Sequence, residues 1–139
     1  METDMHRVIY SRQDLTDDHL QYFMFQVLVG CYYRHTANII HRDLKPQNIG
    51  FSAETNSVQI FDFGLSRELP TLDTTAPFSM SGKVGTLRYM APEVALGSDD
   101  DASYSLAADI FSLALLVWEA CATATPSLAR FGAPFPNVL

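Results

Sequence analysis

Three short motifs organise the sequence, and they read HRDLKPQN at residues 41–48, DFG at residues 62–64 and APE at residues 91–93. DFG begins 14 positions after the first motif ends. A short apolar run at 38–40 precedes the first motif, and an alternating run at 58–61 leads into DFG, so a strand is predicted before each. Because the first motif contains a proline, it is expected in a loop. The polar side chains of both motifs should therefore lie in loops that follow strands.

Two longer segments have the pattern of helices. Thr16 suits an N-cap, two carboxylates follow it, and apolar residues then recur at helical spacing to about Tyr33. Residues 107–122 are apolar nearly all round, which is typical of a helix in the middle of a fold. Residues 66–86 show no clear periodicity, and residues 97–105 are interpreted as a solvated surface loop.

The composition excludes several classes of protein. The chain has 139 residues, a formal net charge of −7, 47% hydrophobic residues and 18% charged residues. A chain of this length and composition can bury a core, and it does not resemble a disordered protein. The acidic balance argues against a general binder of nucleic acid or of an anionic membrane, since both need a basic face. The longest apolar stretch, at 113–118, is too short to span a bilayer.

The cysteines and the N-terminal residues indicate a reducing compartment. Cys31 and Cys121 are 90 positions apart and form no CxxC pair, and residues 1–4 lack the positive charge of a signal peptide. We therefore expect reduced thiols and, by default, a cytoplasmic protein, with the nucleus left open. A zinc site built on Cys31, His35 and His41 would lack a fourth ligand.

Together, the three motifs resemble the catalytic loop, the metal-binding DFG turn and the APE end of the activation segment of eukaryotic protein kinases. The resemblance implies an α+β, mainly α fold: a kinase large (C-terminal) lobe, truncated, that runs from the hinge to helix F, with the small lobe absent. Residues 1–125 are then a partial catalytic domain with its activation segment at 62–93. Residues 126–139 form a proline-containing tail that stays unassigned.

The resemblance also implies the catalytic roles, with ATP and Mg²⁺ as cofactors. Asp43 accepts the proton of the substrate hydroxyl, and Lys45 neutralises charge on the transferring phosphoryl group. Asn48 and Asp62 offer oxygen ligands to Mg²⁺. Lys45 at its position, with Thr86 seven residues before the APE glutamate, resembles the serine/threonine class, in which the threonine hydroxyl bonds the catalytic Asp and Lys.

Regulatory or positioning roles follow from the same resemblance for Arg42, Phe63, Gly64, Ser81, Glu93 and Asp109. Arg42 is of the type that receives an activation-loop phosphate. Ser81 is the preferred carrier of that phosphate, and other carriers stay open: Thr74, Thr75 and Ser79. Asp109 opens a segment similar to helix F and is expected to accept bonds from the backbone of the catalytic loop.

The N-terminal part is similar to mitogen-activated protein kinases over residues 1–9 and 15–23. By that resemblance Met1 lies at the adenine-binding hinge and Asp4 faces the ATP ribose. The activation segment has no Thr-x-Tyr pair and looks like that of other serine/threonine and tyrosine-kinase-like groups. The resemblance therefore supports the superfamily and the serine/threonine class, with protein substrates and an upstream kinase as partners.

Several family features do not appear in the sequence: the Gly-rich loop, the strand lysine and the helix-C glutamate. Gly50 stands where the family usually has a larger residue under adenine, and Phe61 stands where a smaller residue is usual. We expect the chain to be marginally stable and to need the small lobe or a partner chain. The alternative function is a truncated, inactive kinase module that acts as a scaffold or decoy, whose partner capture would survive Asp62→Ala.

Overall fold

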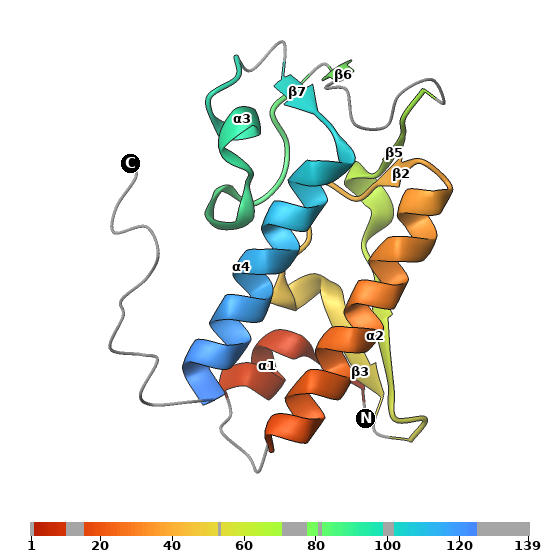
Figure 1. Ribbon diagram of the computed structural model, residues 1–139, viewed down its shortest axis with the longest axis vertical. Coiled ribbons are helices and arrows are strands. Elements are labelled where there is room, and N and C mark those ends of the chain that lie inside the picture. Colours follow the sequence, from red (N-terminus) through yellow and green to blue (C-terminus); the bar gives the residue numbers. More distant parts are fainter. Residues whose placement is uncertain are drawn as a thin grey trace.

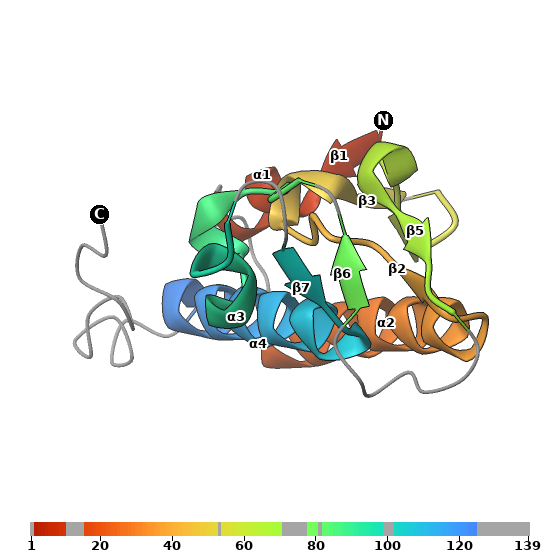
Figure 2. The ribbon, with the colours of Figure 1, turned by 90° about the horizontal axis from the view of Figure 1, so that it is seen from above.

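The computed structural model describes residues 2–10, 16–52, 54–70, 78–80, 82–98 and 102–124. Two long helices, α2 (Asp17–Thr36) and α4 (Leu106–Ala124), lie side by side (Figure 1). From above, the strands lie on one side of this helix pair (Figure 2). The mixture of long helices and small sheets is the mainly helical α+β arrangement that the motifs predicted. Met1, Ser81 and the tail at 126–139 fall outside the described residues.

A three-stranded antiparallel sheet, in the order β1-β3-β4, supports the catalytic loop. Its strands are β1 (Glu2–Asp4), β3 (Ile49–Ser52) and β4 (Ser57–Ile60). The short helix α1 (Met5–Tyr10) follows β1, and the short strand β2 (Ile39–Ile40) precedes the catalytic loop. The strands predicted before the catalytic loop and before DFG are both confirmed.

Helix α2 begins where its N-cap was predicted. The Thr16 hydroxyl accepts a bond from the His19 N–H at 3.3 Å, and the His19 ring accepts one from the Thr16 N–H at 3.5 Å. The helix continues to Thr36, past the predicted end near Tyr33. Its last turn is held from outside, because the His35 ring bonds the Asp109 carboxylate at 3.0 Å. A contact with a residue 74 positions away is not readable from local sequence.

The main core lies between the two long helices, α1 and the sheet. Its buried members are Met5, Ile9, Leu20, Phe23, Val27, Cys31, Leu44, Ile49, Leu113, Leu116 and Ala120. Helix α4 starts and ends within two residues of the predicted 107–122, and its Leu113 and Leu116 face this core. Among the described residues, no helix is both long enough and apolar enough to cross a membrane.

A second buried cluster, which includes Ala102 and Tyr104, corrects one sequence interpretation. Residues 97–105 were expected to be a solvated loop, but they contain strand β7 (Ala102–Tyr104), which pairs with β6 (Phe78–Met80). Ala102 and Tyr104 are both buried, since alternate residues of a strand share one face. The Tyr104 hydroxyl accepts a bond from the Val84 N–H at 2.9 Å. The sequence analysis missed this three-residue strand because the acidic residues that precede it favoured a solvated loop.

The 66–86 stretch, which shows no clear sequence periodicity, contains β6 and a second short strand, β5 (Arg67–Glu68), which pairs with β2. Helix α3 (Pro92–Ala95) begins inside the APE motif. Three single-turn 3-10 helices complete the described part: η1 (Pro46–Asn48), η2 (Phe63–Leu65) and η3 (Leu87–Tyr89).

Candidate active site

The backbone of the catalytic loop is held by Asp109, in the first turn of α4. The His41 and Arg42 N–H groups donate to the two oxygens of its carboxylate, at 2.8 and 3.0 Å. Asp109 is only 1% exposed. Bonds to a buried carboxylate are stronger than those between neutral groups, so they can hold Arg42 at its unusual φ of +71°. The contact expected for Asp109 is therefore present.

Asp43 lies at the centre of a hydrogen-bond network that joins the catalytic loop to the activation segment. Lys45 Nζ donates to Asp43 Oδ2 at 2.7 Å, while the Thr86 hydroxyl and N–H donate to Oδ1 at 2.6 and 2.8 Å. Lys45 Nζ also reaches the Thr86 hydroxyl, at 2.8 Å. The Asn48 amide donates to Asp43 Oδ2 at 3.1 Å. Two further residues of the 41–48 motif and Thr86 from the activation segment thus meet at the Asp43 carboxylate.

The network fixes the charge of Asp43. Burial raises the pKa of its carboxyl group, but the hydrogen bonds from Lys45 and Thr86 and the positive charge of Lys45 outweigh burial. The resulting pKa lies below the usual value of an aspartic acid. Asp43 is therefore ionised at neutral pH, and its carboxylate can accept a hydrogen bond or a proton.

His41 has a supporting position beneath the loop. Its ring is fully buried, and Nδ1 accepts a bond from the Asp43 N–H at 3.3 Å. That bond leaves the proton on Nε2, which donates to the Phe61 carbonyl at 3.2 Å. Burial lowers the pKa of His41, so the ring stays neutral at neutral pH. The ring ties the catalytic loop to the residue before the DFG turn.

Gly85 makes the approach of Thr86 to Asp43 possible. Its φ is +112°, and a Cβ atom placed on it would lie 2.4 Å from the Arg42 carbonyl oxygen. A side chain at this position would push the activation segment away from the catalytic loop. Local sequence offers no reason to single out this glycine, since its close contact is with a residue 43 positions away.

The DFG turn presents Asp62 and Phe63 to solvent. Asp62 has a left-handed backbone with φ of +62°, and its side chain is exposed. The Phe63 ring is 50% exposed, and it contacts the His41 ring edge-on and the Arg34 guanidinium. Gly64 follows within the 3-10 turn η2.

The donor atoms present fit a magnesium ion shared with phosphates. The Asn48 amide nitrogen is used on Asp43, which leaves the amide oxygen as the ligand atom, and the Asp62 carboxylate is exposed. Within the described ranges, no group of three His, Cys, Asp or Glu side chains could hold a metal alone. Mg²⁺ is usually bound by one or two protein oxygens together with phosphates and water, so this sparse donor set suits it.

Three further residues with predicted regulatory or binding roles, Arg42, Glu93 and Asp4, lie outside the hydrogen-bond network of Asp43. Arg42 donates from Nε to the Leu65 carbonyl at 2.6 Å, and its guanidinium lies 5.1 Å from the Tyr104 ring centroid. Glu93 is exposed in the first turn of α3. Asp4 accepts a bond from the Arg7 N–H at 2.8 Å, so it caps α1 at the end of β1.

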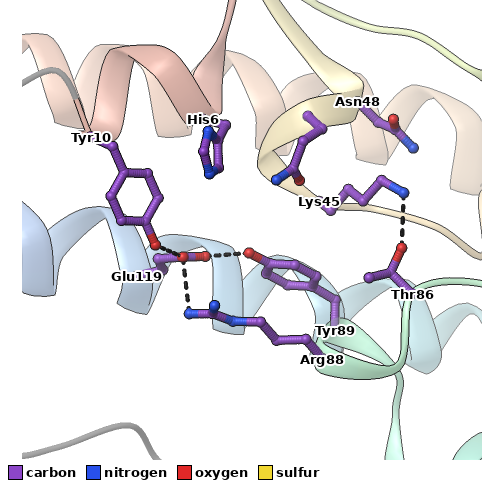
Figure 3. Close-up of a pocket in the computed structure, with 9 residues that line it drawn as sticks. His6, Tyr10, Lys45, Asn48, Thr86, Arg88, Tyr89 and Glu119 are labelled. Carbon is purple, nitrogen blue, oxygen red and sulfur yellow. Dashed lines mark hydrogen bonds and ion pairs between the residues drawn. The ribbon is translucent and has the colours of Figure 1, made fainter.

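A cavity of about 450 Å³ adjoins the Asp43 network (Figure 3). It is lined by His6, Tyr10, Lys45, Gln47, Asn48, Thr86, Arg88, Tyr89 and Glu119. Glu119 is 4% exposed, accepts bonds from the Tyr10 and Tyr89 hydroxyls, and pairs with Arg88 at 3.1 Å. Burial and the bonds to Glu119 raise the pKa of both tyrosines, so both hydroxyls stay protonated and donate.

This carboxylate cluster was missed at the sequence level. One signal was available, because Glu119 directly follows the apolar stretch 113–118 within a helix expected to be buried. A buried carboxylate needs donors, but the sequence does not show which side chains supply them. Through Tyr89 and Arg88, the cluster anchors the 3-10 turn that follows Thr86.

Comparison with known proteins finds matches to protein kinases. The family model of the protein kinase domain matches residues 1–132. Over 119 residues, 86% of this chain, it is 43% identical to mitogen-activated protein kinase 5 of Oryza sativa subsp. indica and 44% identical to mitogen-activated protein kinase 3 of Arabidopsis thaliana. It is 43% identical to mitogen-activated protein kinase 4a of Physcomitrium patens over the same length.

The aligned region covers 30% of the rice and Arabidopsis relatives and 29% of the Physcomitrium relative. The comparisons therefore speak for the shared domain and not for the whole of those proteins. The match of the family model over nearly the entire chain, together with the motifs in their observed arrangement, shows that the chain belongs to the protein kinase family.

Proposed function

We propose that this chain is the large-lobe part of a protein serine/threonine kinase, which transfers a phosphoryl group from Mg-ATP to hydroxyl groups of protein substrates. The observation that carries the proposal is the Asp43 carboxylate, held by Lys45 and Thr86 at hydrogen-bond distance. Phosphoryl transfer depends on positioning and charge neutralisation, and this arrangement supplies a fixed anion beside a fixed cation.

In the proposed reaction, ionised Asp43 accepts a hydrogen bond from the substrate hydroxyl, orients its oxygen and takes up its proton. Lys45 lies beside that carboxylate, and its ammonium group favours negative charge on the group in transfer. Thr86 holds both residues in place through its hydroxyl. The pairing of Lys45 with Thr86 supports the serine/threonine class.

Asn48 and Asp62 would hold the magnesium ions, whose contribution is to neutralise the charge of the phosphates. Asp4 would face the ribose and Met1 the adenine ring. For regulation, we assign Ser81 as the site of an upstream kinase and Arg42 as the receptor of its phosphate. These roles, and the boundary of the catalytic segment at residue 125, rest on the family resemblance.

Calorimetric titration with ATP, with and without Mg²⁺, tests the proposal on the 139-residue chain. The wild-type chain is expected to bind ATP in a Mg²⁺-dependent way, and Asp62→Ala should abolish that dependence. Asp18→Ala is the matched control, because Asp18 is also an exposed aspartate but lies at the start of α2. ATP affinity that Asp62→Ala leaves unchanged would contradict the proposed metal site and favour a scaffold.

A further inference from the structure

The two faces of the three-stranded sheet differ sharply. Ile49, Phe51, Val58 and Ile60 face the main core, on the side covered by α2. Gly50 alternates with these residues and therefore belongs to the opposite face. In the strand register, Gly50 lies directly between Asp4 on β1 and Gln59 on β4, whose side chains share that face.

The space beside Gly50 is filled by the ring of Phe61. A Cβ atom on Gly50 would lie 2.9 Å from Cε1 and 3.4 Å from Cδ1 of that ring. The backbone of Phe61 is fixed on both sides, because its N–H donates to the Asn48 carbonyl at 3.0 Å and its carbonyl accepts from His41 at 3.2 Å. The ring stays 41% exposed, so part of its apolar surface is open to a ligand.

At the sequence level, Gly50 and Phe61 were two separate departures from the family pattern, and Gly50 weakened the expected floor of the adenine site. The structure joins them, because the missing side chain at position 50 is what makes room for the ring from position 61. An apolar side chain thus still covers this position, and it comes from the residue that directly follows β4.

We infer that Phe61 supplies the apolar floor for the nucleotide base in this protein, in place of a side chain at position 50. This inference rests on the proposed function. Phe61 directly precedes Asp62, and Gly50 lies opposite Asp4 in the strand register and two residues after Asn48, so the ring lies next to the segments that carry Asp4, Asn48 and Asp62. A planar aromatic base stacks on an exposed aromatic ring more favourably than on a bare glycine backbone.

Two measurements on the 139-residue chain test the inference. By calorimetry, Phe61→Ala is expected to weaken Mg-ADP binding on the order of tenfold, the size of effect found when a base loses a stacked aromatic ring. Phe25→Ala is the matched control, because Phe25 is also exposed, at 63%, but lies on α2. By NMR, nuclear Overhauser effects are expected between the Phe61 ring protons and the protons of bound adenine.

The outcomes separate this inference from the proposed function. A wild-type chain that fails to bind Mg-ADP overturns the proposed nucleotide site itself. A wild-type chain that binds Mg-ADP, combined with an unchanged affinity in Phe61→Ala or with no Overhauser effect at saturation, overturns only the role of Phe61. If Phe61→Ala does not fold, Phe61→Leu keeps the apolar bulk without the ring and must still weaken binding about threefold.

Discussion

Replacement of Gly85 by alanine should detach the activation segment from the catalytic loop, and Gly82 provides a matched control. Both glycines have positive φ, +112° at Gly85 and +87° at Gly82, so alanine is strained at either position. They differ in their neighbours. A Cβ on Gly82 meets only a Val84 methyl group at 3.6 Å, whereas a Cβ on Gly85 would lie 2.4 Å from the Arg42 carbonyl oxygen.

The magnitude follows from these contacts. Alanine in the left-handed region costs about 1–2 kcal/mol, and both variants carry a strain of this kind because both have positive φ. The Cβ of Gly85→Ala would stand roughly 0.9 Å inside the ~3.3 Å at which a carbon and a carbonyl oxygen normally meet. Relief of that clash moves Thr86 away from Asp43 and breaks its two bonds to the carboxylate. Each bond to a charged group contributes about 1.5–3 kcal/mol, so the loss of both should make Gly85→Ala cost about 3–6 kcal/mol more than Gly82→Ala.

Urea unfolding followed by circular dichroism measures this difference, and an NMR titration of the Asp43 carboxyl group gives a second readout. The pKa of Asp43 should rise in Gly85→Ala and stay unchanged in Gly82→Ala, because only the first variant loses the bonds from Thr86. Equal free energies of unfolding for the two variants, within about 0.5 kcal/mol, would refute the reasoning.

Three further predictions concern single side chains. Thr86→Val removes one hydroxyl bond to Asp43. Because the pKa of Asp43 is depressed in the folded state, the stability that Asp43 contributes is lost as pH falls through that pKa, and the variant should begin to unfold in acid at a higher pH than wild type. An unshifted acid transition would contradict this. Asp109→Asn keeps the shape of the side chain but sets an amide donor against one of the two N–H groups of the catalytic loop. It should lower the free energy of unfolding in urea by about 3 kcal/mol. A loss below about 1 kcal/mol would count against the role of Asp109 in holding the loop. Burial raises the pKa of Cys31 to about 11, so iodoacetamide at pH 8 should alkylate Cys121 before Cys31 in the native chain. In denaturant both thiols should react alike. Faster alkylation of Cys31 than of Cys121 in the native chain would be inconsistent with the burial of Cys31.

Much of the fold and the chemical identity of the site could be predicted from the sequence, because the signals are local. The N-cap at Thr16, the strands before the two loops and the apolar helix near 107–122 each depend on a few neighbouring residues. The motif residues are recognisable because their type and spacing are fixed along the chain. Elements of two or three residues, such as β7, carry too little pattern to be separated from a loop.

The contacts that complete the site depend on tertiary structure. The bond between Asp43 and Thr86 spans 43 positions, and the bond between Tyr10 and Glu119 spans 109. The sequence named Asp43 and Thr86 but could not say how closely they approach, which depends on an unnoticed glycine at position 85. The order of residues along the chain sets which chemical groups are available to the site. Only the packing of the sheet and the helix pair decided which of them meet, because the distance between residues far apart in a chain is set by the whole fold.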